Sequence, residues 1–179
     1  MAPDPPPVDD PVEKARRTWA ERHPDESGFV VLVSMLRTYN LLMREMERLL
    51  KPLELTLSRF EVLLLLSFTR GRALPVMRLR DLLMIHGSSA TYLVDRLSGA
   101  GWVAREADPR DRRVSIVRLT DEGARMVERG VDALAGAGFG PIAGLPEDDR
   151  HALAGLLGAL RGAPPPDGGG PDGRRAPVP

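Results

Sequence analysis

The sequence predicts a mainly α-helical protein with one small β-hairpin. Three stretches of the 179-residue chain support this prediction. Residues 29–50 repeat apolar side chains at spacings of three and four, which is typical of a long amphipathic helix. Residues 79–97 hold two shorter helical patterns separated by a bend. Residues 102–119 hold two short runs with β-branched residues and an Asp-Pro turn between them, and this pattern indicates a hairpin.

The two short helices predict a helix-turn-helix, because a short turn containing glycine joins them. The apolar face of the first helix is made by Leu79, Leu82 and Leu83. We expect the bend at residues 84–87, with Gly87 supplying the backbone freedom that the bend needs. Ser88 or Ser89 is then the expected cap of the second helix. That helix should bury four apolar side chains, which are Ala90, Leu93, Val94 and Leu97.

The hairpin and the segment after it carry a specific motif. The arginine-rich tip reads Asp111-Arg112-Arg113, and Leu119-Thr120-Asp121-Glu122-Gly123 follows. Together they resemble the wing signature of the multiple antibiotic resistance regulator (MarR) family, which is Asp-x-Arg and then Leu-Thr-x-x-Gly. The resemblance covers residues 28–161. It implies a mainly α fold with a small β-wing, in which a winged helix-turn-helix domain is flanked by N- and C-terminal dimerisation helices.

Composition, periodicity and this resemblance divide the chain into six segments. They are a disordered proline-rich tail (1–10), an extra N-terminal helix (11–26), a dimerisation helix (27–55), the winged helix-turn-helix DNA-binding domain (56–120), C-terminal dimerisation helices (121–161) and a disordered Pro/Gly-rich tail (162–179).

Cap residues and glycines place several helix ends. Ser58-Arg59-Phe60-Glu61 reads as a capping box that starts a helix, apolar almost all round, at the buried centre of the domain. Arg72 to Val76 reads as a loop or a short strand. Thr120 should cap the helix after the hairpin. Three glycines at 136–140 should break that helix, since each costs on the order of 1 kcal/mol relative to alanine.

The resemblance places the DNA-binding residues on the second helix of the helix-turn-helix and on the wing. Net charge is zero, but arginines cluster at 70–80 and 105–118, and local basic patches are what bind phosphates. The hydroxyl-bearing residues suit base edges and phosphates. Arg113 would enter the minor groove with Asp111 holding it. Alternatively, the same charges form a solvated hairpin tip. The full expected set is Ser88, Ser89, Thr91, Tyr92, Arg96, Arg110, Asp111, Arg112 and Arg113.

A homodimer and a small-molecule effector are also implied by the resemblance. A dimer would set two DNA-reading helices about 34 Å apart, on a pseudo-palindromic operator. A bound ligand would favour a spacing that no longer fits DNA and so relieve repression. Five residues are candidates to line its pocket, and the alternative for each is a core or anchoring role: Trp19, Tyr39, Met43, Phe60 and Met84.

Other functions are disfavoured by composition. The chain has no cysteine, which excludes disulfides, thiolate metal sites and cysteine nucleophiles. Paired carboxylates, a Ser/His/Asp set and metal-ligand spacing are not evident, so we expect no enzyme activity, no cofactor and no metal. The start lacks the apolar segment of a signal peptide, and no apolar run could span a bilayer, so we expect a soluble cytoplasmic protein without membrane contact. The main alternative is a winged-helix protein-interaction module that does not bind specific DNA.

Overall fold

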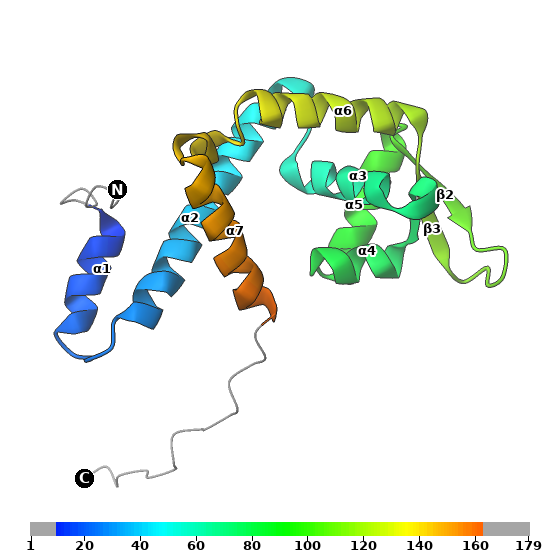
Figure 1. The fold of residues 1–179 in the computed structure, drawn as a ribbon. Helices are drawn as coiled ribbons and strands as arrows, with labels where there is room; N and C mark the ends of the chain where they lie inside the picture. Colours follow the sequence, from blue (N-terminus) through cyan, green and yellow to red (C-terminus); the bar gives the residue numbers. More distant parts are fainter. Residues whose placement is uncertain (1–9, 163–179) are drawn as a thin grey trace, which may run out of the picture. The chain divides into compact units, whose positions relative to one another are not determined.

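The computed structural model describes residues 10–162 (Figure 1). The expected disordered tails lie outside this range, apart from their inner residues Asp10 and Gly162. The helices and strands are α1 (Pro11–Ala20), α2 (Ser27–Leu50), η1 (Lys51–Leu53), α3 (Leu57–Phe68), η2 (Arg70–Arg72), β1 (Ala73–Pro75), α4 (Val76–Leu83), α5 (Gly87–Gly99), β2 (Val103–Ala107), β3 (Ser115–Leu119), α6 (Asp121–Gly136), η3 (Gly140–Gly144) and α7 (Glu147–Gly162). The chain divides into two compact units, of which the first ends at Gly140 and the second begins at Pro141.

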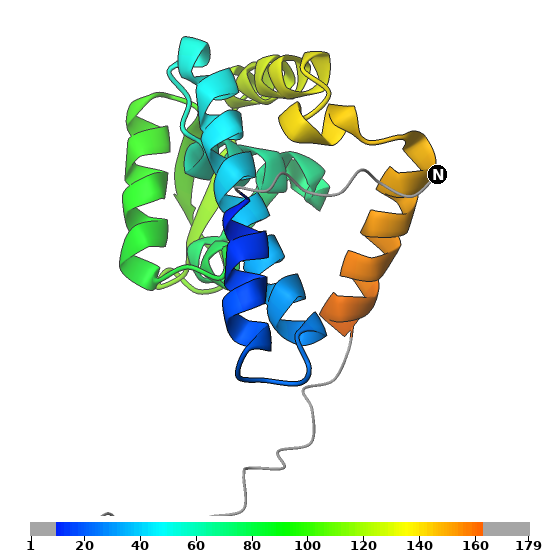
Figure 2. The same ribbon diagram turned by 90° about the vertical axis from the view of Figure 1, so that its left-hand side faces the viewer.

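Helix α1 packs along α2, as Figures 1 and 2 both show. Asp10 begins α1 by accepting a hydrogen bond from the Val12 amide at 3.1 Å. Arg16 joins the two helices, because it pairs with Glu13 at 2.7 Å and with Glu26 at 2.9 Å. Hydrogen bonds from Arg16 and then Arg17 lower the pKa of Glu13 to about 2. The extra N-terminal helix is therefore held to α2 by charge as well as by apolar contact.

Helix α3 lies at the centre of the first unit, as expected from its sequence. Its side chains Leu63 and Leu66 are completely buried, and the helix contacts α2, α5, α6 and β3. Its cap, however, is not the expected one. The side chain of Thr56 accepts a hydrogen bond from the Arg59 amide, so the cap lies two residues before Ser58 and α3 starts at Leu57. The prediction of a capping box at Ser58–Glu61 was wrong, so the Glu61 carboxylate does not cap this helix.

The bend of the helix-turn-helix is formed by a different residue from the one expected. Met84 adopts the left-handed conformation, with φ of 53°, and ends α4. Gly87 is instead the first residue of α5, so its freedom is not what closes the bend. The cap position of α5 is His86, whose side chain makes no capping hydrogen bond. Ser88 and Ser89 therefore lie inside the helix rather than at its cap.

The hairpin forms as predicted and belongs to a three-stranded antiparallel sheet in the order β1-β3-β2. Strands β2 and β3 pair from Val103 opposite Leu119 to Ala107 opposite Ser115. The segment expected to be a loop or short strand is the strand β1, which pairs with the three central residues of β3. This pairing attaches the base of the hairpin to the helical core and leaves its tip projecting (Figure 1).

Thr120 caps α6, as predicted. Its hydroxyl accepts from the Gly123 amide at 3.0 Å and donates to the Gly101 carbonyl at 2.8 Å. Two glycines let α6 approach its neighbours closely. A Cβ at Gly123 would strike the carbonyl oxygen of Trp102, and one at Gly130 would lie 2.5 Å from the ring of Phe60. Small residues at these two places are required by the packing of α6.

The predicted break after α6 is confirmed, since the helix ends at Gly136 and three residues with positive φ follow, which are Gly138, Phe139 and Gly140. The region expected to hold the C-terminal dimerisation helices is thereby divided. Helix α6 packs on α2 and α3 in the first unit, whereas α7 belongs to the second. Within α7, the apolar side chains Leu153, Leu156 and Leu160 are exposed.

Candidate nucleic-acid interface

The outer surface of α5 carries the polar side chains that the sequence singled out. Ala90, Val94 and Leu97 are buried, which fixes the rotation of the helix. All five expected residues of this helix are consequently exposed: Ser88, Ser89, Thr91, Tyr92 and Arg96. The guanidinium carbon of Arg96 lies 6.0 Å from the centre of the Tyr92 ring. Among the side chains of residues 10–162, none caps the helix N-terminus, so its first amides are available to an anion.

Strand β2 of the hairpin is fastened to one flank of α5 by Arg105. This side chain pairs with Asp95 at 2.6 Å and donates a hydrogen bond to the Thr91 carbonyl at 3.3 Å. The sequence analysis gave Arg105 no individual role, because the contact joins residues ten and fourteen positions apart. It sets the position of the hairpin relative to the polar surface of α5.

The hairpin tip is shaped by its two aspartates. Asp108 accepts a hydrogen bond from the Arg110 amide at 2.7 Å, and Asp111 accepts one from the Arg113 amide at 3.0 Å. Asp111 also lies 3.5 Å from the Arg113 guanidinium, and the Arg113 side chain is 94% exposed. The expected contact between Asp111 and Arg113 is thus present. Arg110 and Arg112 are exposed beside it.

Comparison with known proteins identifies this arrangement. The sequence model of the MarR family matches residues 53–114. The transcriptional regulator PecS of Dickeya dadantii is 28% identical over 146 residues, which are 79% of this chain and 87% of PecS. The structure of Sco5413, a MarR family transcriptional regulator from Streptomyces coelicolor, is 30% identical with a TM-score of 0.69, and the match covers 75% of this chain and 92% of that one. The chain belongs to the MarR family of transcriptional regulators.

A second MarR family structure contains DNA. Sco3205 from Streptomyces coelicolor, solved in complex with DNA, is 27% identical with a TM-score of 0.63, and the match covers 74% of this chain and 84% of that one. The proteins that match are regulators rather than enzymes, in line with the absence of catalytic motifs from the sequence. Within residues 10–162 there is no cluster of three potential metal-binding side chains, and no helix is long and apolar enough to cross a membrane.

Not every arginine near this MarR wing is free to contact a ligand. Arg118 pairs with Glu106 at 2.9 Å and also donates to the Gly71 carbonyl at 2.9 Å. Its hydrogen bond lowers the pKa of Glu106. Arg80 pairs with the adjacent Asp81 at 2.6 Å. The arginine clusters seen in the sequence are therefore partly structural, while Arg70, Arg72 and Arg78 of the first cluster are exposed, as are the three arginines of the wing tip.

The five residues expected to line an effector pocket do not share one cavity. Phe60 is 3% exposed and belongs to the core, where it packs against Gly130. Met84 is 91% exposed at the bend, and Tyr39 is 59% exposed on α2. Trp19 and Met43 line two separate hollows, the first lined mainly by α1 and the second mainly by α2. The spacing of apolar residues along a helix does not by itself distinguish residues of the core from residues that line a pocket.

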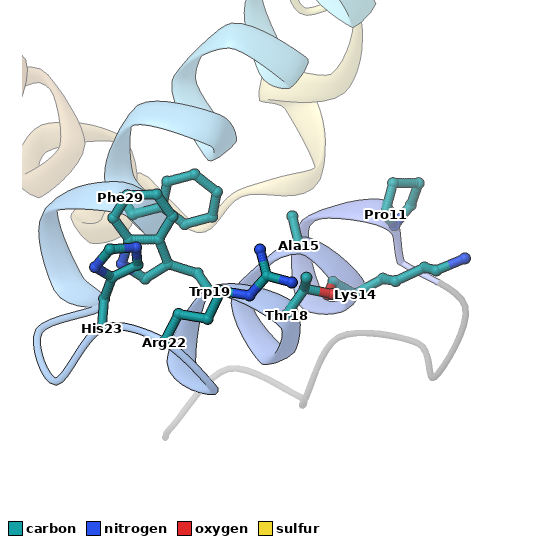
Figure 3. Close-up of a pocket in the computed structure, with 8 residues that line it drawn as sticks. All are labelled: Pro11, Lys14, Ala15, Thr18, Trp19, Arg22, His23 and Phe29. Atoms are coloured by element: carbon teal, nitrogen blue, oxygen red, sulfur yellow. The ribbon is translucent and has the colours of Figure 1, made fainter. Parts of the chain in front are cut away.

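Trp19 nevertheless lines an open hollow of about 480 Å³ (Figure 3). Its indole stacks between His23 and Phe29, with ring centres 4.0 and 4.2 Å apart, and its Nε1 donates to the Asp25 carbonyl. Lys14 and Arg22 supply positive charge along the same hollow. Trp19 is thus an anchor between α1 and α2 that also presents one edge to this basic hollow.

A smaller hollow of about 280 Å³ lies between α3, the end of α4 and α5. Its lining residues are Ser58, Glu61, Leu83, Ile85, Ser89, Tyr92 and Leu93. Burial, and then the nearby Glu47, raises the pKa of the Glu61 carboxyl. This hollow is not evident from the sequence, because three separate elements contribute to it and because Glu61 was expected to cap α3.

Proposed function

We propose that this MarR family protein binds double-stranded DNA sequence-specifically, as a homodimer on a pseudo-palindromic operator, and represses transcription until a small ligand releases it. The observation that carries this proposal is the joint surface of α5 and the wing. Exposed hydroxyl residues cover α5, the exposed Arg113 lies at the hairpin tip, and Arg105 fastens the two together. The DNA complex of the related Sco3205 supports it.

In this arrangement α5 is the recognition helix and lies in the major groove. Ser88, Ser89, Thr91 and Tyr92 are near its N-terminus, where their hydroxyls would meet base edges or phosphates. The uncapped amides of the first turn favour a phosphate at the same end. Arg96, one turn further along, would contact the backbone. The recognition helix carries little charge, so base readout should be modest and the wing should supply much of the affinity.

The wing would contact the neighbouring minor groove. Arg113 would enter the groove, where a narrow A·T-rich segment concentrates negative potential. Asp111 limits the directions that Arg113 can take, through the contact at 3.5 Å and the hydrogen bond to its amide. Arg110 and Arg112 would contact phosphates on either side. These contacts predict a steep dependence of affinity on salt.

Two unpartnered apolar surfaces support a homodimer. One lies on α2 and consists of Val31, Leu32, Met35, Leu36 and Tyr39, all exposed. The other is the exposed leucine stripe of α7. Contiguous apolar patches of this kind are uncommon on monomers and mark association surfaces. A second copy of the chain would cover them and set the two recognition helices about one DNA turn apart.

Relief by a ligand is supported by the hollow beside Trp19. It combines an aromatic edge with Lys14 and Arg22, which suits a small planar anion. It also lies where α1 packs on α2, next to the proposed dimer surface. A ligand there would shift the population of dimers towards a spacing that does not fit the operator.

The test is fluorescence anisotropy with DNA from upstream of the protein's own gene and a scrambled duplex, at several salt concentrations. We expect at least about a thousandfold preference for the upstream DNA. Arg113→Ala should weaken binding and reduce the salt slope, while Arg129→Ala, an exposed arginine on α6, should change neither. Equal weak binding to both duplexes would contradict specific recognition. No binding at low salt would favour the protein-interaction module instead.

A further inference from the structure

The hollow between α3, α4 and α5 has a composition that favours a particular kind of ligand. One wall is aliphatic and consists of Leu83, Ile85 and Leu93. Three residues that carry hydroxyls also line it, which are Ser58, Ser89 and Tyr92, and Glu61 supplies a single carboxylate. An apolar wall with a few converging polar groups is the usual make-up of a small-molecule site. At about 280 Å³ the hollow would hold a ligand of roughly a dozen heavy atoms or fewer.

The Glu61 carboxylate lacks a counter-charge. Within residues 10–162 no cation or hydrogen-bond donor lowers the pKa of this carboxylate, which is exposed to solvent at the mouth of the hollow. Other glutamates of this arginine-rich chain are paired, since Glu13, Glu45 and Glu106 each bind an arginine. The nearby Glu47 adds a second negative charge and contributes to the raised pKa of Glu61. A bound cation would favour the ionised carboxylate and would offset the repulsion from Glu47.

We propose that this hollow binds a small amphipathic ammonium compound, with Glu61 as the counter-ion and the Leu83–Ile85–Leu93 wall holding its hydrocarbon part. A metal ion does not fit, because Glu61 is the only carboxylate among the lining residues and hard cations need several oxygen ligands. An anion would meet the unpaired carboxylate.

The site shares two residues with the proposed DNA surface, so its effect on DNA rests on the proposed function. Ser89 and Tyr92 line the hollow and also lie on the exposed side of the recognition helix. When they are engaged with a ligand they are not free to reach base edges. Binding of the ammonium compound and of DNA should therefore be antagonistic, and each should weaken the other by the same factor.

The first experiment uses the free full-length protein and no DNA. It is titrated with 2-phenylethylammonium, with the neutral 2-phenylethanol and with the anionic 3-phenylpropanoate, and amide chemical shifts are followed by NMR. We expect shifts concentrated at Ser58, Ser89 and Tyr92, and an affinity for the ammonium probe at least about tenfold above that for the other two, as a charge-assisted hydrogen bond provides. Glu61→Gln should abolish this preference, whereas Glu128→Gln, an exposed glutamate on α6, should keep it.

Equal affinity for the three probes, retained preference in Glu61→Gln, or shifts centred on Trp19 would each overturn the proposal. The second experiment repeats the ammonium titration with upstream DNA present. A protein that binds DNA but not the ammonium probe refutes this site alone. A protein that binds the probe through Glu61 but no DNA supports the site and refutes the proposed function.

Discussion

Replacement of Gly123 by alanine should destabilise the protein, although alanine is ordinarily the better helix residue. A Cβ at this position would strike the carbonyl oxygen of Trp102 and lie 2.8 Å from Leu119 Cδ1 and 3.0 Å from the Trp102 carbonyl carbon. Two of these neighbours are backbone atoms held by the hydrogen bond from the Thr120 amide to Trp102, so they cannot move aside by changing a rotamer. Overpacking of this kind costs about 1–3 kcal/mol, with rigid neighbours at the upper end.

The helical preference for alanine offsets part of that cost, by at most about 1 kcal/mol. A net loss of about 2 kcal/mol corresponds to a fall in Tm of about 4–8 °C for a chain of this size. Thermal unfolding followed by circular dichroism measures it, at one protein concentration because dimerisation would change apparent stability. Gly99→Ala is the control, since a Cβ there meets nothing within 4 Å. If Gly123→Ala melted at or above the temperature of Gly99→Ala, the close approach of α6 to Trp102 would be refuted.

Three further substitutions test other parts of the structure. Thr120→Ala removes the hydroxyl that caps α6 and binds the Gly101 carbonyl, so it should lower the unfolding free energy by about 1 kcal/mol in urea titrations; an unchanged midpoint would contradict the cap. Glu61→Gln should be more stable than the parent at pH 7, by less than about 1 kcal/mol because solvent still screens the group. The folded state raises the pKa of Glu61, so the cost of ionising Glu61 in the parent protein grows as pH rises through that pKa. The unfolding free energies of the parent and the variant should therefore converge below about pH 4. A difference in unfolding free energy that did not change with pH would count against the raised pKa. Leu36→Lys on the exposed face of α2 should yield a monomer by light scattering, and a dimer that persists would place the interface elsewhere.

The features predicted correctly from sequence are those set by local periodicity and local chemistry. The long apolar repeat became α2, and the almost entirely apolar segment became the buried helix α3. Thr120 caps α6 because threonine followed by two acidic residues leaves few alternative start points. The glycines after residue 135 end the same helix. Each of these depends on residues within a few positions of one another.

The errors occurred where tertiary contacts choose between local options. Several residues near the start of α3 could serve as its cap, and the packed position of the helix selects Thr56 over Ser58. The bend after α4 uses Met84 in a left-handed conformation, although Gly87 is the residue better suited to one. Phe60 was a pocket candidate, but it is a core residue because α6 approaches it at Gly130. The hollow at Glu61 depends on three elements brought together only by folding.

The Arg105 bridge has a consequence for how such a regulator could acquire new targets. Arg105 binds both the side chain of Asp95 and the backbone of α5. These two contacts hold the helix and the hairpin in a fixed position relative to each other. On the proposed DNA complex, the distance between the bases met by α5 and the groove met by the hairpin is then constant. New preferences can arise by exchanging hydroxyl residues on the helix, without altering the length of each half-operator. In the proposed dimer, a change in the spacing between half-operators would require a change in the contact between the two subunits.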